Sequence, residues 1–263
     1  MKNRKAYAVI TGASSGIGAA FAELLAKEGY SLILVARRAE KLKEVKAYIE
    51  SYMHPDAICI THPMDVTDPR ECDRLMDLLC DQKIAIFINN AGFGDCCYFP
   101  EGDISKEMSM IDVNIKAVHY LTKLVLARFR AQKKGYLLNV ASVAGLMPAG
   151  PYMATYYASK AYVVSLTMAI ANELKDHKSR IYVGCLCPGP VDTEFNHTAN
   201  VEFALPGISP LTCASYAVAQ MKKRRTLIIP GPEIKLCALA GHIFPRALST
   251  KIVGAQQLRK IYR

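Results

Sequence analysis

The chain has 263 residues, a length that suits one or two domains, and 51% of them are hydrophobic, which is enough for a sizeable core. No stretch approaches the roughly 18 to 20 apolar residues that a membrane span needs, and no signal segment is expected ahead of the first strand. The net charge of +10 is concentrated at residues 222–263, which hold ten Lys or Arg and one acid, whereas residues 1–221 are nearly balanced.

The nine cysteines are scattered along the chain. Cys96-Cys97 and Cys185-x-Cys187 are close pairs, but no second pair lies at a spacing typical of zinc sites. We therefore expect reduced thiols in a cytoplasmic protein and no metal site. Nucleic-acid binding is not expected either, because no basic element carries interleaved aromatic residues.

The chain opens with an apolar run at 6–10, a turn at 11–18 and an apolar-periodic segment that Gly29 ends, which predicts strand, tight turn and helix. Glycines in the turn allow a sharp bend and let a pyrophosphate approach the backbone. The helix that follows directs its free N–H groups and its positive dipole end at such an anion. The spacing Gly-x-x-x-Gly-x-Gly therefore predicts a dinucleotide site, although glycine-rich turns also cap ordinary helices. The residues expected to contact the cofactor in this turn are Gly12, Ser14, Ser15, Gly16, Ile17 and Gly18.

A second strand, expected at 31–35, leads into a turn formed by Ala36, Arg37 and Arg38. In dinucleotide sites of this architecture, a carboxylate after the second strand binds the 2′-hydroxyl of NAD. Ala36 stands at that position, so no carboxylate repels a 2′-phosphate, and Arg37 can pair with one. The turn predicts NADP(H), with Arg37 as the main determinant and Arg38 as a helper. The alternative is a solvated arginine pair at the start of a helix.

Strand and helix patterns alternate to the end of the chain without a linker. This alternation predicts a single α/β domain over 1–263, with a Rossmann-type doubly wound, mainly parallel sheet of about seven strands and helices on both faces. Ligands bind such sheets at the carboxyl ends of the strands. Further strands are expected at 57–61, 84–88, 136–140, 181–187 and 226–229, and helices at 40–52, from 68 onward, at 105–132 and at 153–176. A substrate loop that leaves room for short helices is expected at 190–222, and a helical basic tail that Pro245 breaks at 233–263.

Most of the polar motifs stand at the ends of these expected strands. They are Thr11–Gly18, Asn89–Gly92, Ser142 and Pro188–Thr193, together with Asn114 and the run from Tyr156 to Lys160 on expected helices. As a set, over about residues 5–193, they resemble the short-chain dehydrogenase/reductase family. The resemblance implies a nicotinamide-dependent oxidoreductase that forms a homodimer or homotetramer through its two long helices.

Tyr156 and Lys160 are four residues apart in an expected helix, so they share a face. A nearby ammonium favours the phenolate, so we expect Lys160 to lower the pKa of Tyr156 toward a usable pH. Tyr156 can then give a proton to a carbonyl oxygen or take one from an alcohol, while the Ser142 hydroxyl holds the same oxygen. The resemblance implies that Lys160 also binds the ribose hydroxyls and that Asn114 holds a water that relays protons. Taken singly, Ser142 could be an ordinary loop residue and Asn114 a satisfied polar group in a helix.

The resemblance also assigns residues to the two halves of the cofactor. Residues 89–92 would lie beside the adenosine half, residues 65–66 would flank the adenine, and residues 188–193 would contact the nicotinamide amide. Plain turn chemistry is the alternative for each of these segments. With Tyr156 and Lys160, the cofactor residues implied in this way are Asp65, Val66, Asn89, Ala91, Gly92, Pro188, Gly189, Val191 and Thr193.

The expected substrate pocket is largely apolar and has no convergent basic group for a phosphate or carboxylate. This composition predicts an uncharged or bulky apolar ketone, such as a steroid or a lipid-like carbonyl compound. Apolar residues in loops are often ordinary packing, which is the alternative. The expected lining is Phe93, Val143, Tyr152 and Phe195, with Leu146, Met147, Phe203 and Leu205 around them.

Three functions are compatible with these motifs. The first is an NADP(H)-dependent carbonyl reductase or alcohol dehydrogenase, of which a hydroxysteroid dehydrogenase is one example. The second is a sensor that binds NADP(H) without turnover, although a sensor has no need of Asn114, Ser142, Tyr156 and Lys160. The third is an epimerase or dehydratase of the extended branch of the family, whose members are longer and usually space their glycines Gly-x-x-Gly-x-x-Gly.

The tail also leaves alternatives open. Residues 234–244 are mostly apolar, and the surrounding segment is strongly basic. A helix packed on another subunit is the favoured interpretation, and a solvated basic face over ordinary core is the second. Contact with an anionic membrane surface is the third.

Overall fold

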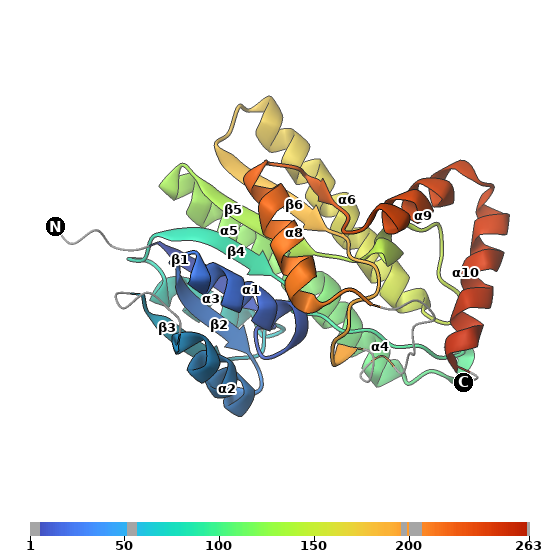
Figure 1. The fold of residues 1–263 in the computed structure, drawn as a ribbon, viewed down its shortest axis with the longest axis horizontal. Coiled ribbons are helices and arrows are strands. Elements are labelled where there is room, and N and C mark those ends of the chain that lie inside the picture. The colour runs from blue at the N-terminus through green and yellow to red at the C-terminus, as the bar shows by residue number, and fades with distance from the viewer. Residues whose placement is uncertain (1–5, 52–56, 196–198, 200–206, 262–263) are drawn as a thin grey trace.

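The computed structural model describes residues 6–51, 57–195, 199 and 207–261, and seven strands among them form one parallel sheet (Figure 1). Its strand order is β3-β2-β1-β4-β5-β6-β7. Strands β2 and β3 are added on one side of β1, and β4 to β7 are added on the other side, so the order reverses between β1 and β4. The predicted doubly wound α/β fold is therefore confirmed. The strands are β1 (Tyr7–Thr11), β2 (Ser31–Ala36), β3 (Cys59–Pro63), β4 (Ile84–Asn89), β5 (Gly135–Val140), β6 (Ile181–Leu186) and β7 (Leu227–Ile228).

Helices cover both faces of the sheet (Figure 1). On one face lie α1 (Gly16–Lys27), α2 (Ala39–Glu50) and α8 (Pro210–Lys222), and on the other α3 (Pro69–Leu78), α5 (Val118–Gln132) and α6 (Ala154–Asp176). Strand β1 shows why its sequence is apolar throughout: Ala8 and Ile10 pack toward α1, while Tyr7 and Val9 pack toward α3 and α5. A parallel strand covered on both sides buries every side chain, and so it lacks polar alternation.

The helix expected over 105–132 is divided into three segments. These are α4 (Ile104–Ile111), a π-helix over Asp112–Ala117, and α5. A π segment inside an α-helix widens one turn, and such turns are frequent at functional sites. Here the widened turn contains Asn114, whose side-chain amide forms hydrogen bonds with the segment after β4 and with α6, as described below.

The stretch expected as a loop at 190–222 contains the 13-residue helix α8. Ser209 caps it by accepting a hydrogen bond from the Thr212 N–H at 3.1 Å, and Pro210 occupies its first turn. Buried Cys213, Ala217 and Met221 recur every four residues and pack in the same core as α1. The other mismatch is smaller: the third strand, expected at 57–61, runs from Cys59 to Pro63.

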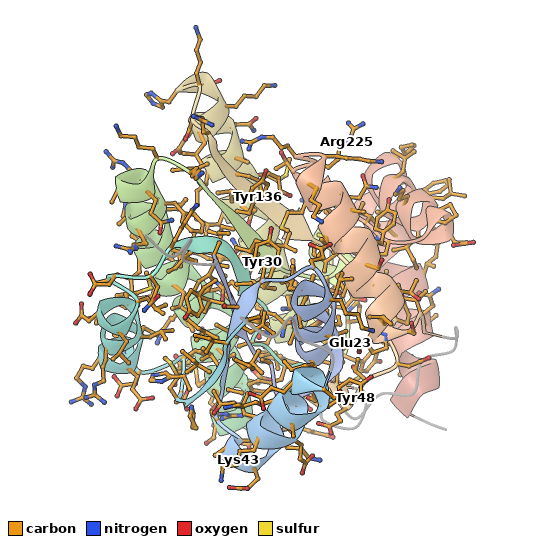
Figure 2. The ribbon with its side chains drawn as sticks, turned by 60° about the vertical axis from the view of Figure 1, so that its left-hand side comes forward. Glu23, Tyr30, Lys43, Tyr48, Tyr136 and Arg225 are labelled. Atoms are coloured by element: carbon orange, nitrogen blue, oxygen red, sulfur yellow. The ribbon has the colours of Figure 1, made fainter. Side chains whose placement is uncertain are left out.

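The tail forms two helices, α9 (Pro232–Ile243) and α10 (Arg246–Ile261), with the expected break at Pro245. They lie together at one end of the molecule, and α2 lies at the other end (Figure 1). Figure 2 shows Lys43 and Tyr48 projecting outward from α2. None of the helices in the described part of the chain is both long and apolar enough to cross a bilayer.

Candidate active site

A cleft of about 690 Å³ lies at the carboxyl edge of the sheet. The turns that follow β1 to β6 all contribute to its lining, including those after β1 and β4, the two central strands between which the strand order reverses. In open α/β sheets, ligands bind at this topological switch point. The volume falls within the range of roughly 300–1,000 Å³ found for cofactor and small-molecule sites.

The glycine turn forms one end of the cleft. Gly12 and Gly16 have φ values of +64° and +55°, a left-handed conformation that favours glycine. A Cβ on Gly16 would lie 3.1 Å from a Thr193 methyl, so the lack of a side chain keeps this turn close to the segment after β6. Ser15 stands at the N-cap of α1, yet its side chain does not cap the helix. The amide groups at the start of α1 therefore remain suited to an anionic group such as a pyrophosphate.

The two arginines after β2 differ in their contacts. Arg38 donates to the hydroxyls of Ser15 at 2.8 Å and Ser14 at 3.1 Å, and it forms a 2.9 Å ion pair with Glu194 from the segment after β6. This guanidinium holds the pKa of the Glu194 carboxyl below its ordinary value. Arg37 also lines the cleft, is exposed, and has no hydrogen bond or ion pair with the residues that the structure describes. Of the two, Arg37 is the free cation.

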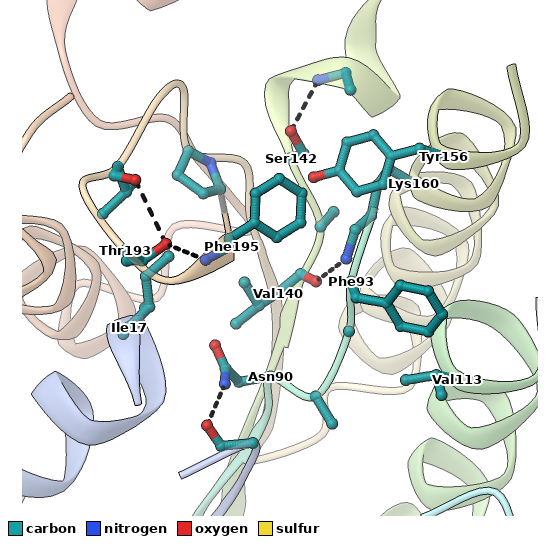
Figure 3. Close-up of a pocket in the computed structure, with 18 of the residues that line it drawn as sticks. Ile17, Asn90, Phe93, Val113, Val140, Ser142, Tyr156, Lys160, Thr193 and Phe195 are labelled. Atoms are coloured by element: carbon teal, nitrogen blue, oxygen red, sulfur yellow. Dashed lines mark hydrogen bonds between the residues drawn. The ribbon is translucent and has the colours of Figure 1, made fainter. Parts of the chain in front are cut away.

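At the other end of the cleft, the Tyr156 hydroxyl lies close enough to the Ser142 hydroxyl for that group to lower the pKa of Tyr156. Ser142 accepts a hydrogen bond from the Ala144 N–H at 3.1 Å. Figure 3 shows the two hydroxyls near each other, with the rings of Phe93 and Phe195 nearby. The Lys160 ammonium donates to the Val140 carbonyl at 3.2 Å and lies 5.7 Å from the centroid of the Tyr156 ring. The three side chains predicted from the sequence motifs are thus brought together.

Burial dominates the protonation of both titratable groups. It raises the pKa of Tyr156 well above its ordinary value, and the Ser142 hydroxyl offsets only part of that rise. The expectation that Lys160 lowers this pKa is therefore wrong for this structure, because the ammonium contacts the Val140 carbonyl and the ring rather than the hydroxyl. Burial also lowers the pKa of Lys160 from 10.5 to about 8.

The depressed pKa of Lys160 predicts that Lys160→Met is more stable than the wild type at pH 7. In the wild type, burial of the ammonium costs about 3 kcal/mol, and the variant avoids this cost. The variant also loses the hydrogen bond to Val140, which contributes about 1 kcal/mol, so its free energy of unfolding is expected to rise by about 2 kcal/mol. Between pH 8 and 10.5 the unfolded chain binds more protons at this site than the folded chain, so wild-type stability rises and the difference shrinks. Urea unfolding of both proteins across this range measures the difference; a difference independent of pH contradicts the assignment.

Asn114 lies behind the cleft wall and is fully buried. Its amide oxygen accepts from the Phe93 N–H at 3.1 Å, and its amide nitrogen donates to the Phe93 carbonyl at 2.8 Å and to Ser159 at 3.1 Å. A Cβ on Gly92 would lie 2.8 Å from that oxygen and 3.2 Å from the Lys160 ammonium. The widened π turn therefore fastens the segment after β4 to α6, next to Lys160.

A family model described as short chain dehydrogenase matches residues 6–202, about three quarters of the chain. The chain belongs to the short-chain dehydrogenase/reductase family. It is an oxidoreductase by this membership, which agrees with the resemblance found in its motifs.

Individual relatives are moderately similar. A very-long-chain 3-oxoacyl-CoA reductase of Pyrenophora tritici-repentis is 34% identical over 207 residues, which cover 77% of this chain and 60% of the reductase. A short-chain dehydrogenase of Sphingobium yanoikuyae in complex with NADPH is 30% identical, with a TM-score of 0.80 and coverage of 90% and 93% of the two chains. A family member from Burkholderia phymatum in complex with NAD is 26% identical, with a TM-score of 0.82 and coverage of 92% and 94%.

Most residues that the sequence motifs selected line the cleft of this family member. Five of the described ones do not. Gly18 packs on the Gly12 carbonyl, Asn89 donates to the Val118 carbonyl at 3.1 Å, Asn114 lies behind the wall, and Tyr152 lines a separate small cavity. The fifth is Leu146, and Phe203 and Leu205 lie outside the described residues. The selected residues in the lining are Gly12, Ser14, Ser15, Gly16, Ile17, Arg37, Arg38, Asp65, Val66, Ala91, Gly92, Phe93, Ser142, Val143, Met147, Tyr156, Lys160, Pro188, Gly189, Val191, Thr193 and Phe195.

Asn90 belongs to the motif at 89–92 but was not among the individual residues assigned to the cofactor. It lines the cleft, and its side-chain amide donates to the Thr11 carbonyl at 2.9 Å, which joins the turns after β1 and β4. The lining residues from the tail were missed from the sequence. Gln257 from α10 is 2% exposed and donates to the Tyr157 hydroxyl at 2.6 Å. Ile234 lies shortly after the last strand, β7. It could have been predicted as a lining residue, because ligands bind at the carboxyl ends of parallel strands. The tail residues of the lining are Ile234, Cys237, Val253, Gln256 and Gln257.

Proposed function

We propose that the protein is an NADP(H)-dependent oxidoreductase that interconverts a secondary alcohol and a ketone by hydride transfer, with Tyr156 as the acid and base. The observation that carries the proposal is the Tyr156–Ser142 hydroxyl pair, with Lys160 beside it, in the same cleft as the glycine turn. The NADPH and NAD complexes of the two structural relatives support a nicotinamide cofactor.

The residues of the cleft fit a dinucleotide. The start of α1, with Gly12 and Gly16, offers amide groups and space for the pyrophosphate. In the proposed complex, Arg37 would face the adenosine half and Thr193 the nicotinamide half. When bound, the nicotinamide supplies or accepts the hydride. Lys160 is well placed for a ribose hydroxyl because Gly92 leaves room beside its ammonium.

The chain's own residues handle the proton. Tyr156 holds its proton at neutral pH, as an ordinary phenol does, and burial raises its pKa further, so the proton is present for donation to a carbonyl oxygen. Ser142 already accepts from the Ala144 N–H, so its own hydroxyl proton is available for the same oxygen. This arrangement favours carbonyl reduction as the direction in which the free enzyme is correctly protonated.

The substrate proposed is an apolar ketone of lipid-like or steroid-like size. Support comes from Phe93, Met147, Phe195, Ile234 and Val253 around the hydroxyl pair, and from the 3-oxoacyl-CoA reductase among the relatives. The test is a panel of long-chain 3-oxoacyl thioesters, ketosteroids and small keto acids with NADPH, followed by absorbance of the reduced nicotinamide. Turnover of small charged keto acids alone contradicts the proposed substrate. Binding of NADPH without turnover of any ketone supports the sensor alternative instead.

Cofactor choice is tested by Arg37→Ala. Removing a free guanidinium at the adenosine end is expected to weaken NADPH binding about ten- to hundredfold, the range for charge-assisted hydrogen bonds, and to leave NADH binding nearly unchanged. Isothermal titration with each cofactor measures both affinities. Arg70→Ala, which changes an exposed arginine at the start of α3, is the matched control. Equal losses for NADPH and NADH in Arg37→Ala contradict the NADP(H) preference.

A further inference from the structure

The two tail helices expose large apolar side chains to an unusual degree. We define the tail surface as Leu236, Leu239 and Ile243 of α9, Phe244 after it, and Leu248 and Ile252 of α10. Their exposed fractions are 68%, 57%, 71%, 51%, 48% and 50% in that order. Contiguous apolar surfaces of this kind mark interaction sites on soluble folds.

The exposure is not a sign that these helices lack inward contacts. On α9, Ile234 lines the cleft and Ala238 is buried, while Leu236, Leu239 and Ile243 recur on another face at helical spacing. On α10, Val253 and Gln257 are buried, and Leu248 and Ile252 lie four residues apart on an exposed face. Each helix therefore has an inner face that closes the cleft and an outer apolar face that the described residues leave uncovered.

The charge around the tail surface points to one kind of occupant. Residues 234–263 contain six Lys or Arg and no Asp or Glu. Of these, Lys235, Arg246 and Lys251 are exposed in the described part of the chain. Two copies meeting through this face would bring like charges together, whereas anionic lipid headgroups would complement them. Apolar side chains ringed by lysine and arginine are the pattern of helices that lie in a membrane interface.

We propose that the tail surface binds an anionic lipid bilayer, with α9 and α10 lying in the plane of the interface. None of the described helices is able to cross a bilayer, so the contact is peripheral. The proposal concerns binding and stands apart from the proposed oxidoreductase activity. Its geometry places the outer faces of the two helices in lipid while their inner faces close the cleft.

The test is co-sedimentation of the full chain with vesicles of phosphatidylcholine alone and of phosphatidylcholine with phosphatidylserine, at low and high salt. We expect binding to the phosphatidylserine vesicles at low salt and a loss of at least about tenfold at high salt, because salt screens the basic residues. Leu236→Gln with Leu239→Gln is expected to weaken binding about a hundredfold, roughly tenfold for each leucine withdrawn from lipid.

The matched control is Leu78→Gln with Tyr48→Gln. These residues are each 59% exposed on α3 and α2, and α2 lies at the end of the molecule remote from the tail (Figure 1). The control should bind like the wild type, and unfolding midpoints should show that both variants are folded. The proposal is overturned if the wild type ignores phosphatidylserine, if the control loses as much binding, or if light scattering shows that the leucine variant only dissociates an oligomer.

Discussion

Tyr156→Phe is expected to lower kcat for carbonyl reduction about a thousandfold, the middle of the range for loss of a general acid. The substitution removes the hydroxyl and keeps the ring, which lies 5.5 Å from the Phe195 ring and 5.7 Å from the Lys160 ammonium. The cleft should therefore keep its shape, and NADPH affinity should change less than about threefold. Steady-state kinetics and a direct binding titration separate the two quantities.

Tyr162→Phe is the control for this experiment. Tyr162 lies on the same helix, α6, and its hydroxyl bonds to His119 at the surface, 2.7 Å away, so its loss should leave kcat unchanged. Ser142→Ala should fall between the two, with a loss of about 10²-fold, because one hydrogen bond to the reacting oxygen disappears. If Tyr156→Phe keeps at least a tenth of the wild-type kcat, Tyr156 is not the general acid of the reaction.

Gly18→Ala is expected to lower the free energy of unfolding by about 3 kcal/mol and to abolish measurable cofactor binding. A Cβ at this position would fall on the Gly12 carbonyl oxygen, and it would lie 2.8 Å from both the Gly12 carbonyl carbon and the Asn90 amide nitrogen. Two of these three atoms belong to the backbone, so the turn itself has to move. The unfolding midpoint should drop by about 10 °C.

Gly29→Ala is the comparison for Gly18→Ala, because it introduces backbone strain without a steric clash. Gly29 has a φ of +84°, and no heavy atom lies within 4 Å of the position that its Cβ would take. The expected cost is therefore only the strain of a left-handed alanine, about 1 kcal/mol, with cofactor binding retained. Equal destabilisation by the two substitutions would show that the glycine turn is not the tightly packed cradle described above.

The parts of the cleft that the sequence predicted are those made by short local motifs. A glycine turn after β1, an arginine pair after β2 and Ser142 after β5 are each positioned by the strand before them, and parallel strands bring their carboxyl ends to one edge. Tyr156 and Lys160 need only helical spacing to share a face. These placements depend on little beyond the order of strands and helices.

The parts that could not be predicted depend on tertiary packing. Gln257 reaches the cleft because α10 folds back on α6, and nothing in the periodicity of a helix identifies its neighbour. The shift in the pKa of Tyr156 was predicted with the wrong sign, because a four-residue spacing places an amine near a ring but specifies neither burial nor the distance to the hydroxyl. Only short helices were allowed within the loop predicted at 190–222, although Ser209 and Pro210 form a recognisable start for the 13-residue helix α8.

The ion pair between Arg38 and Glu194 connects the turn after β2 with the segment after β6. Both side chains are about half exposed, at 49% and 52%, so the pair contributes at most about 1 kcal/mol and is readily exchanged for another anion. Glu194 directly precedes Phe195, whose ring packs against Tyr156. Under the proposed function, a nucleotide phosphate that competed for this guanidinium would act on the same backbone segment that forms the wall beside the phenol. One short stretch of chain would then respond both to the proposed cofactor and to the proposed ketone.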